Sequence, residues 1–383
     1  FYPNAFRYRE WVIDAFNDDL PYNEFIRKQL AADLLQGISS RDLPALGFIG
    51  LGHKYYDRNR LAVKAEEWAE QVDTLTRSLL GLTVACARCH DHKYDPFTQK
   101  DYYALAGVFA STDLVDRMAD GSEIKKNAEA AKKRINTIHM VRDVKPKDLH
   151  VFLRGNTDVK GDLVPRRFIR VLSKNEPKPF IQGSGRLELA ESVVSPNNPL
   201  TARVIVNRAW AMFFGRGLVI TPSNFGQLGA APSHPALLDN LAVRFMENGW
   251  SMKQLIREMV LSSTYRQRSR ESHTNKAIDP MNINLWRMNR RRLSIEQWRD
   301  SILSAGGSLD RTGGKSLELT DKKNVRRTIY GHISRKKLND MLMQFDYPDP
   351  NVHAAKRSAT TTAVQKLFVM NNRFMVEQAK RLA

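Results

Sequence analysis

The two cysteines of this chain are separated by two residues, and a histidine follows the second one directly. They lie in the segment Cys86-Ala87-Arg88-Cys89-His90, and none of the other 381 residues is a cysteine. This spacing is typical of c-type haem attachment, because each thiol adds to one vinyl group of the porphyrin and the adjacent imidazole then ligates the iron. The motif therefore predicts a covalent haem c on Cys86 and Cys89, with His90 as the proximal iron ligand.

Two other interpretations of the cysteine pair stay open. A zinc ion can be held by both thiols together with one or two histidines. Against zinc, Cys89 and His90 are adjacent, which strains a tetrahedral site, and the sequence has no second Cys-x-x-Cys. The pair can also form a local disulfide, or pack without any cofactor.

Other polar residues are candidates for supporting roles around a haem. His53 can serve as the sixth iron ligand. His92 is too close to His90 in the sequence to reach the opposite haem face. We expect it to orient a propionate or to pair with a neighbouring carboxylate. The acidic residues that can accept hydrogen bonds from these histidines are Asp73, Asp91 and Asp95.

The charge of the chain favours anionic partners. Its 60 Lys and Arg against 41 Asp and Glu give a formal net charge of +19. A redox partner protein, an anionic polymer or an anionic surface fits this charge. No nucleic-acid-binding motif accompanies it, so no specific nucleic acid is expected. No apolar run approaches the ~20 residues of a membrane-spanning helix, so this chain is not predicted to be transmembrane.

The spacing of apolar residues predicts a mostly α-helical chain with two helical domains. The first covers residues 1–110 and is truncated at its N-terminus. Its cysteine motif lies between two helices whose apolar faces can line a haem. Residues 111–150 form a charged connection, with a charged helix around 122–139. The second domain covers residues 151–383 and is helical, with a few short strands, one of them over 328–333.

The most polar constellation of the predicted second domain is a candidate for an anion or substrate site. Arg203, Asn207 and Arg208 share one predicted helix, and His234 follows later in the chain. The alternative is structural hydrogen bonding to the glycine-rich loop after this helix. The sequence contains no Ser-His-Asp order, phosphate-binding glycine loop or His-Glu-x-x-His helix that would indicate hydrolysis.

Longer runs of the sequence resemble two families. The segments 11–17, 20–22, 71–74, 86–93 and 101–103 resemble the planctomycete cytochrome C domain family. The second half is similar to the planctomycete-specific domain of unknown function that commonly follows it. The matching segments are 195–203, 207–208, 214–218, 221–226, 234–235, 249–251, 263–267 and 290–293. One departure is visible: relatives tend to have a cysteine shortly after Asn351, where this chain reads His-Ala-Ala-Lys-Arg over 353–357.

The resemblance implies an exported protein of the periplasm or cell envelope, with further cytochrome-like or carbohydrate-binding modules upstream of this fragment. It implies no settled biochemical activity, and whether the chain is an enzyme stays open. The first functional hypothesis is electron transfer or another redox role by a haem domain. The alternatives are an envelope binding or scaffold module with a structural Cys-x-x-Cys-His, and a metal-dependent hydrolase linked to the breakdown of anionic polysaccharide.

Overall fold

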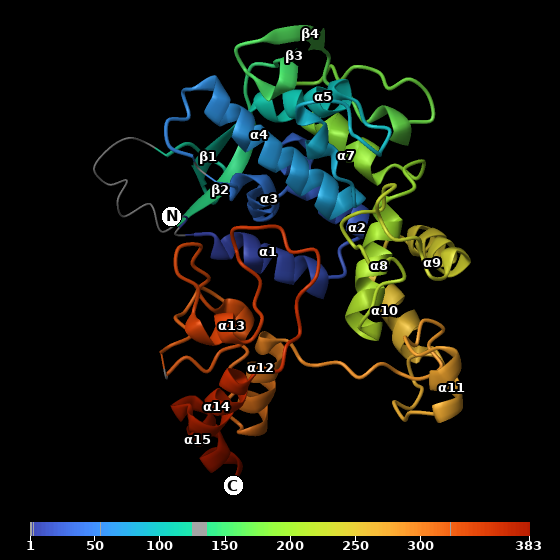
Figure 1. Ribbon diagram of the computed structural model, residues 1–383. Coiled ribbons are helices and arrows are strands. Elements are labelled where there is room, and N and C mark those ends of the chain that lie inside the picture. Colours follow the sequence, from blue (N-terminus) through green and yellow to red (C-terminus); the bar gives the residue numbers. More distant parts are fainter. Residues whose placement is uncertain (1, 3, 54, 125–135, 322) are drawn as a thin grey trace. The chain divides into compact units, whose positions relative to one another are not determined.

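The structure, a computed structural model, describes residues 2, 4–53, 55–124, 136–321 and 323–383. These residues are mostly helical, as the sequence predicts, and their strands form two small two-stranded sheets (Figure 1). The chain divides into two compact units, unit 1 (Phe1–Asn289) and unit 2 (Arg290–Ala383). The domain boundary predicted around residues 111–150 falls inside unit 1, and that domain division stays a prediction.

The first part of unit 1 is helical and carries the cysteine motif. Its helices are α1 (Phe6–Asn17), α2 (Tyr22–Ala31), α3 (Gly47–Gly50), α4 (Leu61–Leu75) and α5 (Gln99–Ala110), with the short turns η1 (Ala32–Leu34), η2 (Ser40–Leu46), η3 (Thr76–Leu80) and η4 (Val84–Arg88). Helix α5 begins with a capping box, in which the side chains of Thr98 and Asp101 each accept a hydrogen bond from the other's backbone N–H. Helices α4 and α5 pack against each other and against η4, which places the motif at one end of this helical pair.

The four strands that the structure describes come from the middle of the unit 1 sequence, between residues 112 and 164. Strands β1 (Thr112–Met118) and β2 (Thr137–Asp143) pair antiparallel, as do β3 (Leu149–Phe152) and β4 (Lys160–Val164). The predicted charged helix over 122–139 is wrong at its C-terminal end, where β2 begins with β-branched and apolar residues suited to a buried strand. The rest of that prediction falls largely on residues 125–135, which lie outside the described residues.

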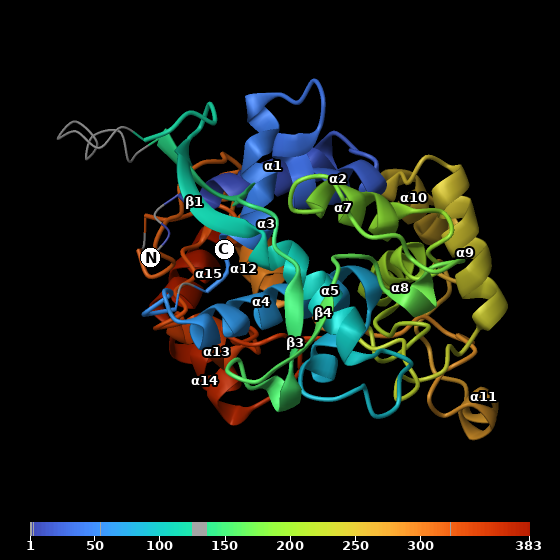
Figure 2. The ribbon, with the colours of Figure 1, turned by 90° about the horizontal axis from the view of Figure 1, so that it is seen from above.

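The remaining helices of unit 1 are α7 (Arg186–Val194), α8 (Thr201–Phe214), α9 (Pro235–Glu247), α10 (Met252–Leu261) and α11 (His273–Ile278). The turns η6 (Leu153–Gly155) and η7 (Arg170–Leu172) precede them. Helix α8 packs against α9 and α10, and Figure 2 shows this group on one side of the unit and β1 on another. Gly215, with φ of 79°, ends α8 in the left-handed conformation that glycine adopts without strain.

Buried polar contacts join the early and late parts of unit 1. The side chain of Arg186, 2 % exposed, forms ion pairs with Asp33 at 2.9 Å and with Asp143 at 2.6 Å. The backbone N–H of Tyr22 donates to the carbonyl of Trp250 at 3.0 Å. Residues more than 100 positions apart in the sequence therefore share one core.

Unit 2 consists of α12 (Ile295–Ala305), the turn η8 (Thr328–Tyr330), α13 (Asp340–Gln344), α14 (Ala363–Asn371) and α15 (Arg373–Leu382). Ser294 and Gln297 form a capping box at the start of α12. The strand predicted over 328–333 is wrong. The N–H and the hydroxyl of Thr328 both donate to the carboxylate of Asp300 on α12, at the start of the turn η8. After that turn, Gly331 forms only an isolated bridge with Leu317. Within the described ranges, we find no helix that is both long and apolar enough to span a membrane.

Candidate functional site

The Cys-x-x-Cys-His motif is a surface feature that is anchored from below. The preceding helix and its π turn end at Gly81, where φ is 63°. Val84 and Ala87 are fully buried and fix the motif's backbone to the core, whereas the two cysteines and His90 are exposed. The local sequence therefore turns apolar side chains inward and all three predicted haem-binding side chains toward solvent.

Arg88, the second of the two residues between the cysteines, is bound by side chains of α4 and α5. The guanidinium of Arg88 donates to both carboxylate oxygens of Glu66 on α4, at 2.8 and 2.7 Å. This pairing raises the pKa of Arg88 above its usual value, although partial burial opposes the shift. Its carbonyl accepts hydrogen bonds from the Tyr103 hydroxyl at 3.1 Å and the Gln99 amide at 3.2 Å. The motif is thus attached to both α4 and α5.

Both thiols are free, and a hairpin tip lies against one of them. A Cβ placed on Gly155 would lie only 2.7 Å from Sγ of Cys89, so only a glycine permits this approach of the turn between β3 and β4. Close to that glycine in the sequence, the same tip exposes Leu153 (46 %) and Val159 (45 %). The surface beside the thiols is therefore partly apolar.

The hydrogen bonding of His90 leaves one ring nitrogen available. Its Nδ1 lies 2.6 Å from the backbone carbonyl oxygen of Asp91. A carbonyl oxygen only accepts, so Nδ1 carries the proton and Nε2 keeps its lone pair. Metal-ligating histidines usually have this arrangement, in which the non-ligating nitrogen donates to a carbonyl or carboxylate. His90 therefore has the tautomer of an iron ligand.

His92 has the opposite tautomer and a different role. Its Nδ1 accepts the backbone N–H of Asp95 at 2.9 Å, so the proton is on Nε2. That nitrogen lies 3.1 Å from Oγ1 of Thr83 and 3.6 Å from a carboxylate oxygen of Asp95. With both ring nitrogens engaged, His92 shapes the loop after the motif. Its pairing with Asp95 matches one of the two roles that the sequence predicts.

The carboxylate of Asp95 connects the motif loop to a distant segment. It is 5 % exposed and accepts the backbone N–H of Gln227 at 2.6 Å. A Cβ on Gly226 would lie 2.5 Å from its oxygens, so the two backbones are in close contact there. Asp95 is therefore placed to fix the loop that carries His90.

The other two predicted carboxylates bind elsewhere. Asp91 accepts the backbone N–H of Gln99 at 2.7 Å, at the start of α5. Asp73 forms an ion pair with Arg77, one helical turn away, at 2.6 Å. Neither carboxylate makes a hydrogen bond to His90 or His92 among the described residues, and the support of these histidines by the two carboxylates remains a prediction.

His53 is engaged with an acidic residue. Its Nδ1 lies 3.7 Å from a carboxylate oxygen of Glu70 on α4. The neighbouring Tyr55 has its pKa raised by burial and by Glu70, and the charge of Arg88 opposes that shift. This loop therefore lies in the electrostatic neighbourhood of the motif, and the role of His53 as sixth ligand remains a prediction.

The helices on either side of the motif do not present their apolar faces to it. Their predicted apolar residues are buried in the common core, with exposures of 7 % or less: Trp68, Val72, Leu75, Leu79, Tyr102, Leu105, Ala106 and Phe109. Because these side chains pack against each other, the expected apolar lining from α4 and α5 is used for folding.

Comparison with known families matches both parts of the chain. A family model named PSCyt2, described as a protein of unknown function (DUF1549), matches residues 1–114. A second, PSD1, described as a protein of unknown function (DUF1553), matches residues 185–383, more than half of the chain. The chain belongs to the PSD1 family. The expected order, a planctomycete cytochrome C domain followed by the planctomycete-specific domain, is confirmed. No curated protein and no solved structure matches.

In the PSD1 part of unit 1, Asn207 has a structural role. Its side chain is fully buried, donates to the carbonyl of Val219 at 2.9 Å and accepts the N–H of the same residue at 2.8 Å. A Cβ on Gly217 would lie 2.9 Å from the Asn207 amide. The structural alternative, hydrogen bonding to the glycine-rich loop after the helix, is therefore what the geometry shows for Asn207.

Arg208 also binds backbone, on the other side of α8. Its guanidinium donates to the carbonyls of Ser78 and Arg77, at the end of the π turn that precedes the motif. A cation is favourable there, because the carbonyl groups at a helix C-terminus carry partial negative charge. Burial lowers the pKa of this arginine, although it stays cationic. Arg208 thus joins the PSD1 part to the PSCyt2 part.

The last two members of the constellation lie at the surface. Arg203 pairs with Asp239 on α9 at 2.5 Å. The half-buried His234 has its Nδ1 3.0 Å from the hydroxyl of Ser233. Because each of the four predicted residues binds a different partner, the structure does not bring them together around one site.

The zinc interpretation lacks a complete ligand set. Among the residues that the structure describes, no group of three or more His, Cys, Asp or Glu side chains is arranged to hold a metal ion. His92, which could be a second histidine ligand, has a protonated Nε2 and an Nδ1 that accepts the backbone N–H of Asp95.

Sequence reasoning missed the neighbours of the motif that come from far along the chain. Gly155 was recognisable as a turn residue, and residues 224–226 as part of a PSD1 motif. Nothing in either pattern indicates contact with Cys89 or Asp95, because these contacts span 66 and 132 positions.

Proposed function

We propose that Cys86 and Cys89 carry a covalently attached c-type haem with His90 as its proximal ligand, and that the chain has an electron-transfer role in an exported protein of the cell envelope. When bound, such a haem supplies a one-electron iron couple whose potential depends on its axial ligands and surroundings.

The observation that carries this proposal is the state of His90 beside two free, exposed thiols. Nδ1 of His90 lies 2.6 Å from the carbonyl oxygen of Asp91 and donates its proton to it, which leaves Nε2 as the nitrogen that can ligate iron. The hydrogen bond that Nδ1 donates also raises the basicity of the ligating nitrogen, Nε2. The residues present therefore suit a haem in two respects, free and exposed thiols and an imidazole nitrogen that is available as a ligand.

The surroundings of the motif support this assignment further. Arg88 and Asp95 fix the backbone on either side of His90 through Glu66 and Gln227. The hairpin tip that contacts Cys89 through Gly155 exposes Leu153 and Val159, which can offer apolar contacts to a porphyrin edge. Because the motif is exposed, a haem held there would be accessible to a partner protein. Attachment of this kind normally takes place outside the cytoplasm, which supports export.

The test is maturation of the unmodified protein in a host that attaches haem c, followed by a pyridine haemochrome spectrum and a haem stain after denaturing electrophoresis. We expect haem that stays bound to the denatured chain. The double variant Cys86→Ala/Cys89→Ala should lose it completely, because no thiol is left to form a thioether.

His90→Ala tests the ligand separately. We expect covalent haem with a high-spin spectrum or poor retention. His234→Ala is the control, since it removes a half-buried histidine far from the motif in sequence and should leave the spectrum unchanged. Maturation without any haem refutes the proposed function, and an unchanged spectrum in His90→Ala refutes the ligand assignment alone.

A second candidate is the binding or scaffold module with a structural motif. The observation that favours it is the use of Asn207 and Arg208 in backbone contacts, which leaves the PSD1 part of unit 1 without its predicted polar site. A correctly folded chain that never acquires haem would favour this candidate.

A further inference from the structure

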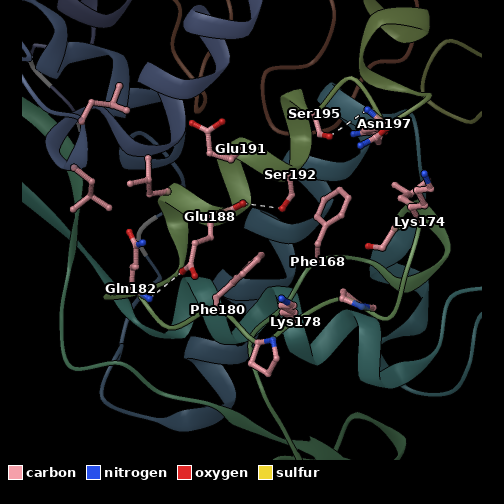
Figure 3. A pocket seen from close by; sticks show the side chains of 18 of the residues that line it. Phe168, Lys174, Lys178, Phe180, Gln182, Glu188, Glu191, Ser192, Ser195 and Asn197 are labelled. Atoms are coloured by element: carbon pink, nitrogen blue, oxygen red, sulfur yellow. Dashed lines mark hydrogen bonds between the residues drawn. The ribbon is translucent and has the colours of Figure 1, made fainter.

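Unit 1 contains a pocket that lies in a part of the chain to which no role has been assigned. It has a volume of about 830 Å³ and lies between the segment after α2, the extended segment 168–182, and α7 with the turn that follows it (Figure 3). Pockets of this size take small organic molecules. Part of its wall falls between the two regions matched by family models.

The apolar part of the wall is preformed. Phe168 and Phe180 are 5 % and 8 % exposed, and both line the pocket. Pro177 and Pro179 restrict the backbone of the loop before Phe180. The backbone N–H of Phe180 donates to the carbonyl oxygen of Arg166 at 2.7 Å, and this hydrogen bond fixes the end of that loop.

The acidic groups of the pocket are already paired. Glu188 accepts the N–H groups of Ile181 and Gln182 with its two carboxylate oxygens, at 3.0 and 3.1 Å. Glu191 receives both N–H groups of the Arg27 guanidinium, at 2.9 and 2.8 Å. Neither carboxylate is therefore free to attract a cation.

The basic groups of the pocket are unpaired. Lys174 and Lys178 line it, and within the described part of the chain neither ammonium group has a hydrogen-bond or ion-pair partner. The side-chain amide of Asn197 is also uncommitted, and Figure 3 shows it on the same side of the view as Lys174. The nearby acidic residue Glu176 pairs with Arg170 at 3.0 Å instead.

We propose that this pocket binds a small organic anion with an apolar body. Its anionic group, a carboxylate or a phosphate or sulfate ester, is bound by Lys174 and Lys178, and Asn197 donates a further hydrogen bond. Its apolar body packs against Phe168 and Phe180. The formal charge of +19 adds a field that attracts such a ligand. This binding does not depend on haem attachment.

The test is a ligand-observed NMR titration of the full chain with phenyl phosphate, benzoate, benzyl alcohol and inorganic phosphate. Phenyl phosphate should bind saturably in about the millimolar range, and more weakly as salt is added. Benzyl alcohol lacks the charge and inorganic phosphate lacks the ring, so each should bind at least about fivefold more weakly. If benzoate binds as tightly as phenyl phosphate, the anionic group of the ligand is a carboxylate. If benzoate does not bind, the anionic group is a phosphate or sulfate ester.

Variants of the two lysines test whether phenyl phosphate binds in this pocket. Lys174→Gln and Lys178→Gln should each weaken phenyl phosphate binding by about fivefold, as expected for the loss of one exposed ion pair, and the double variant by more. Lys145→Gln is the matched control, because Lys145 is exposed, also unpaired and outside the pocket wall. Circular dichroism verifies that all variants are folded. The proposal is overturned if phenyl phosphate does not saturate, if benzyl alcohol binds as tightly, or if the double variant binds like the control.

Discussion

Asn207 allows the sharpest test of how this fold is held together. The sequence places it in a polar constellation that suits a ligand site, whereas the structure buries it completely and pairs its amide with both backbone groups of Val219. Asn207→Ala removes the side-chain donor and acceptor together. One buried N–H and one buried C=O of a residue that is only 2 % exposed are then left without partners.

The size of the effect follows from these two groups. Each buried polar group left unpaired costs about 1–3 kcal/mol, so the free energy of unfolding should fall by about 2–6 kcal/mol. Arg203→Ala on the same helix is the matched control. Its ion pair with Asp239 lies at the surface, with side-chain exposures of 38 % and 48 %, so the expected loss is below about 1 kcal/mol.

Urea unfolding followed by circular dichroism measures both variants. A midpoint for Asn207→Ala that equals that of Arg203→Ala would show that the Val219 contacts contribute little, and would return Asn207 to the list of ligand candidates. Asn207→Asp provides a second test. Burial should raise the pKa of the new carboxyl, so its stability relative to the unmodified chain should be best below about pH 4 and should decline as pH rises.

Three other substitutions test neighbouring parts of unit 1 by the same assay. Arg186→Met should lower stability by about 3–5 kcal/mol, because it leaves two carboxylates without their buried cation, and a loss below 1 kcal/mol would contradict this. Burial raises the pKa of Asp101, but hydrogen bonds from the backbone and from arginine outweigh it and the net pKa is lowered. Its contribution is therefore present above about pH 4 and is lost as pH falls through the lower folded-state pKa, so Asp101→Asn should flatten the acid decline of stability between about pH 5 and 2. Gly81→Ala should destabilise more than Gly249→Ala. Both glycines have positive φ, but only at Gly81 would the added Cβ meet another residue, 2.8 Å from the ring of Phe225; equal losses would argue against that contact.

The PSCyt2 and PSD1 matches are separate in sequence but share unit 1 in the structure. Arg208 on α8 binds the carbonyls that precede the motif, and Asp95 after the motif binds Gln227. The motif-bearing loop is therefore held from both sides by residues of the PSD1 part. These contacts position the loop of the proposed haem site, although the PSD1 part contributes no proposed ligand.

The sequence by itself determined the features that depend on near neighbours. The capping boxes at Thr98 and Ser294, the helical faces of α4 and α5, and the spacing of the two cysteines with His90 all involve residues a few positions apart. Interactions over one helical turn are encoded locally, so they are readable before folding. The same holds for the family motifs, and both expected families match.

Local patterns were insufficient where the partner came from elsewhere. Residues 328–333 have strand-like composition, but Asp300 binds Thr328 and produces a turn. The apolar residues of α4 and α5 were expected to line a haem, but they pack into the common core.

Only the tertiary structure decided between the alternative roles of the polar residues. The tautomers of His90 and His92 depend on which backbone groups the folded loop brings to each ring. The contact of Cys89 with Gly155 and the pocket beside Phe168 depend on packing between segments that are distant in the sequence. A side chain's hydrogen-bond partner is set by how whole elements pack, and that packing minimises the exposure of apolar surface across the chain.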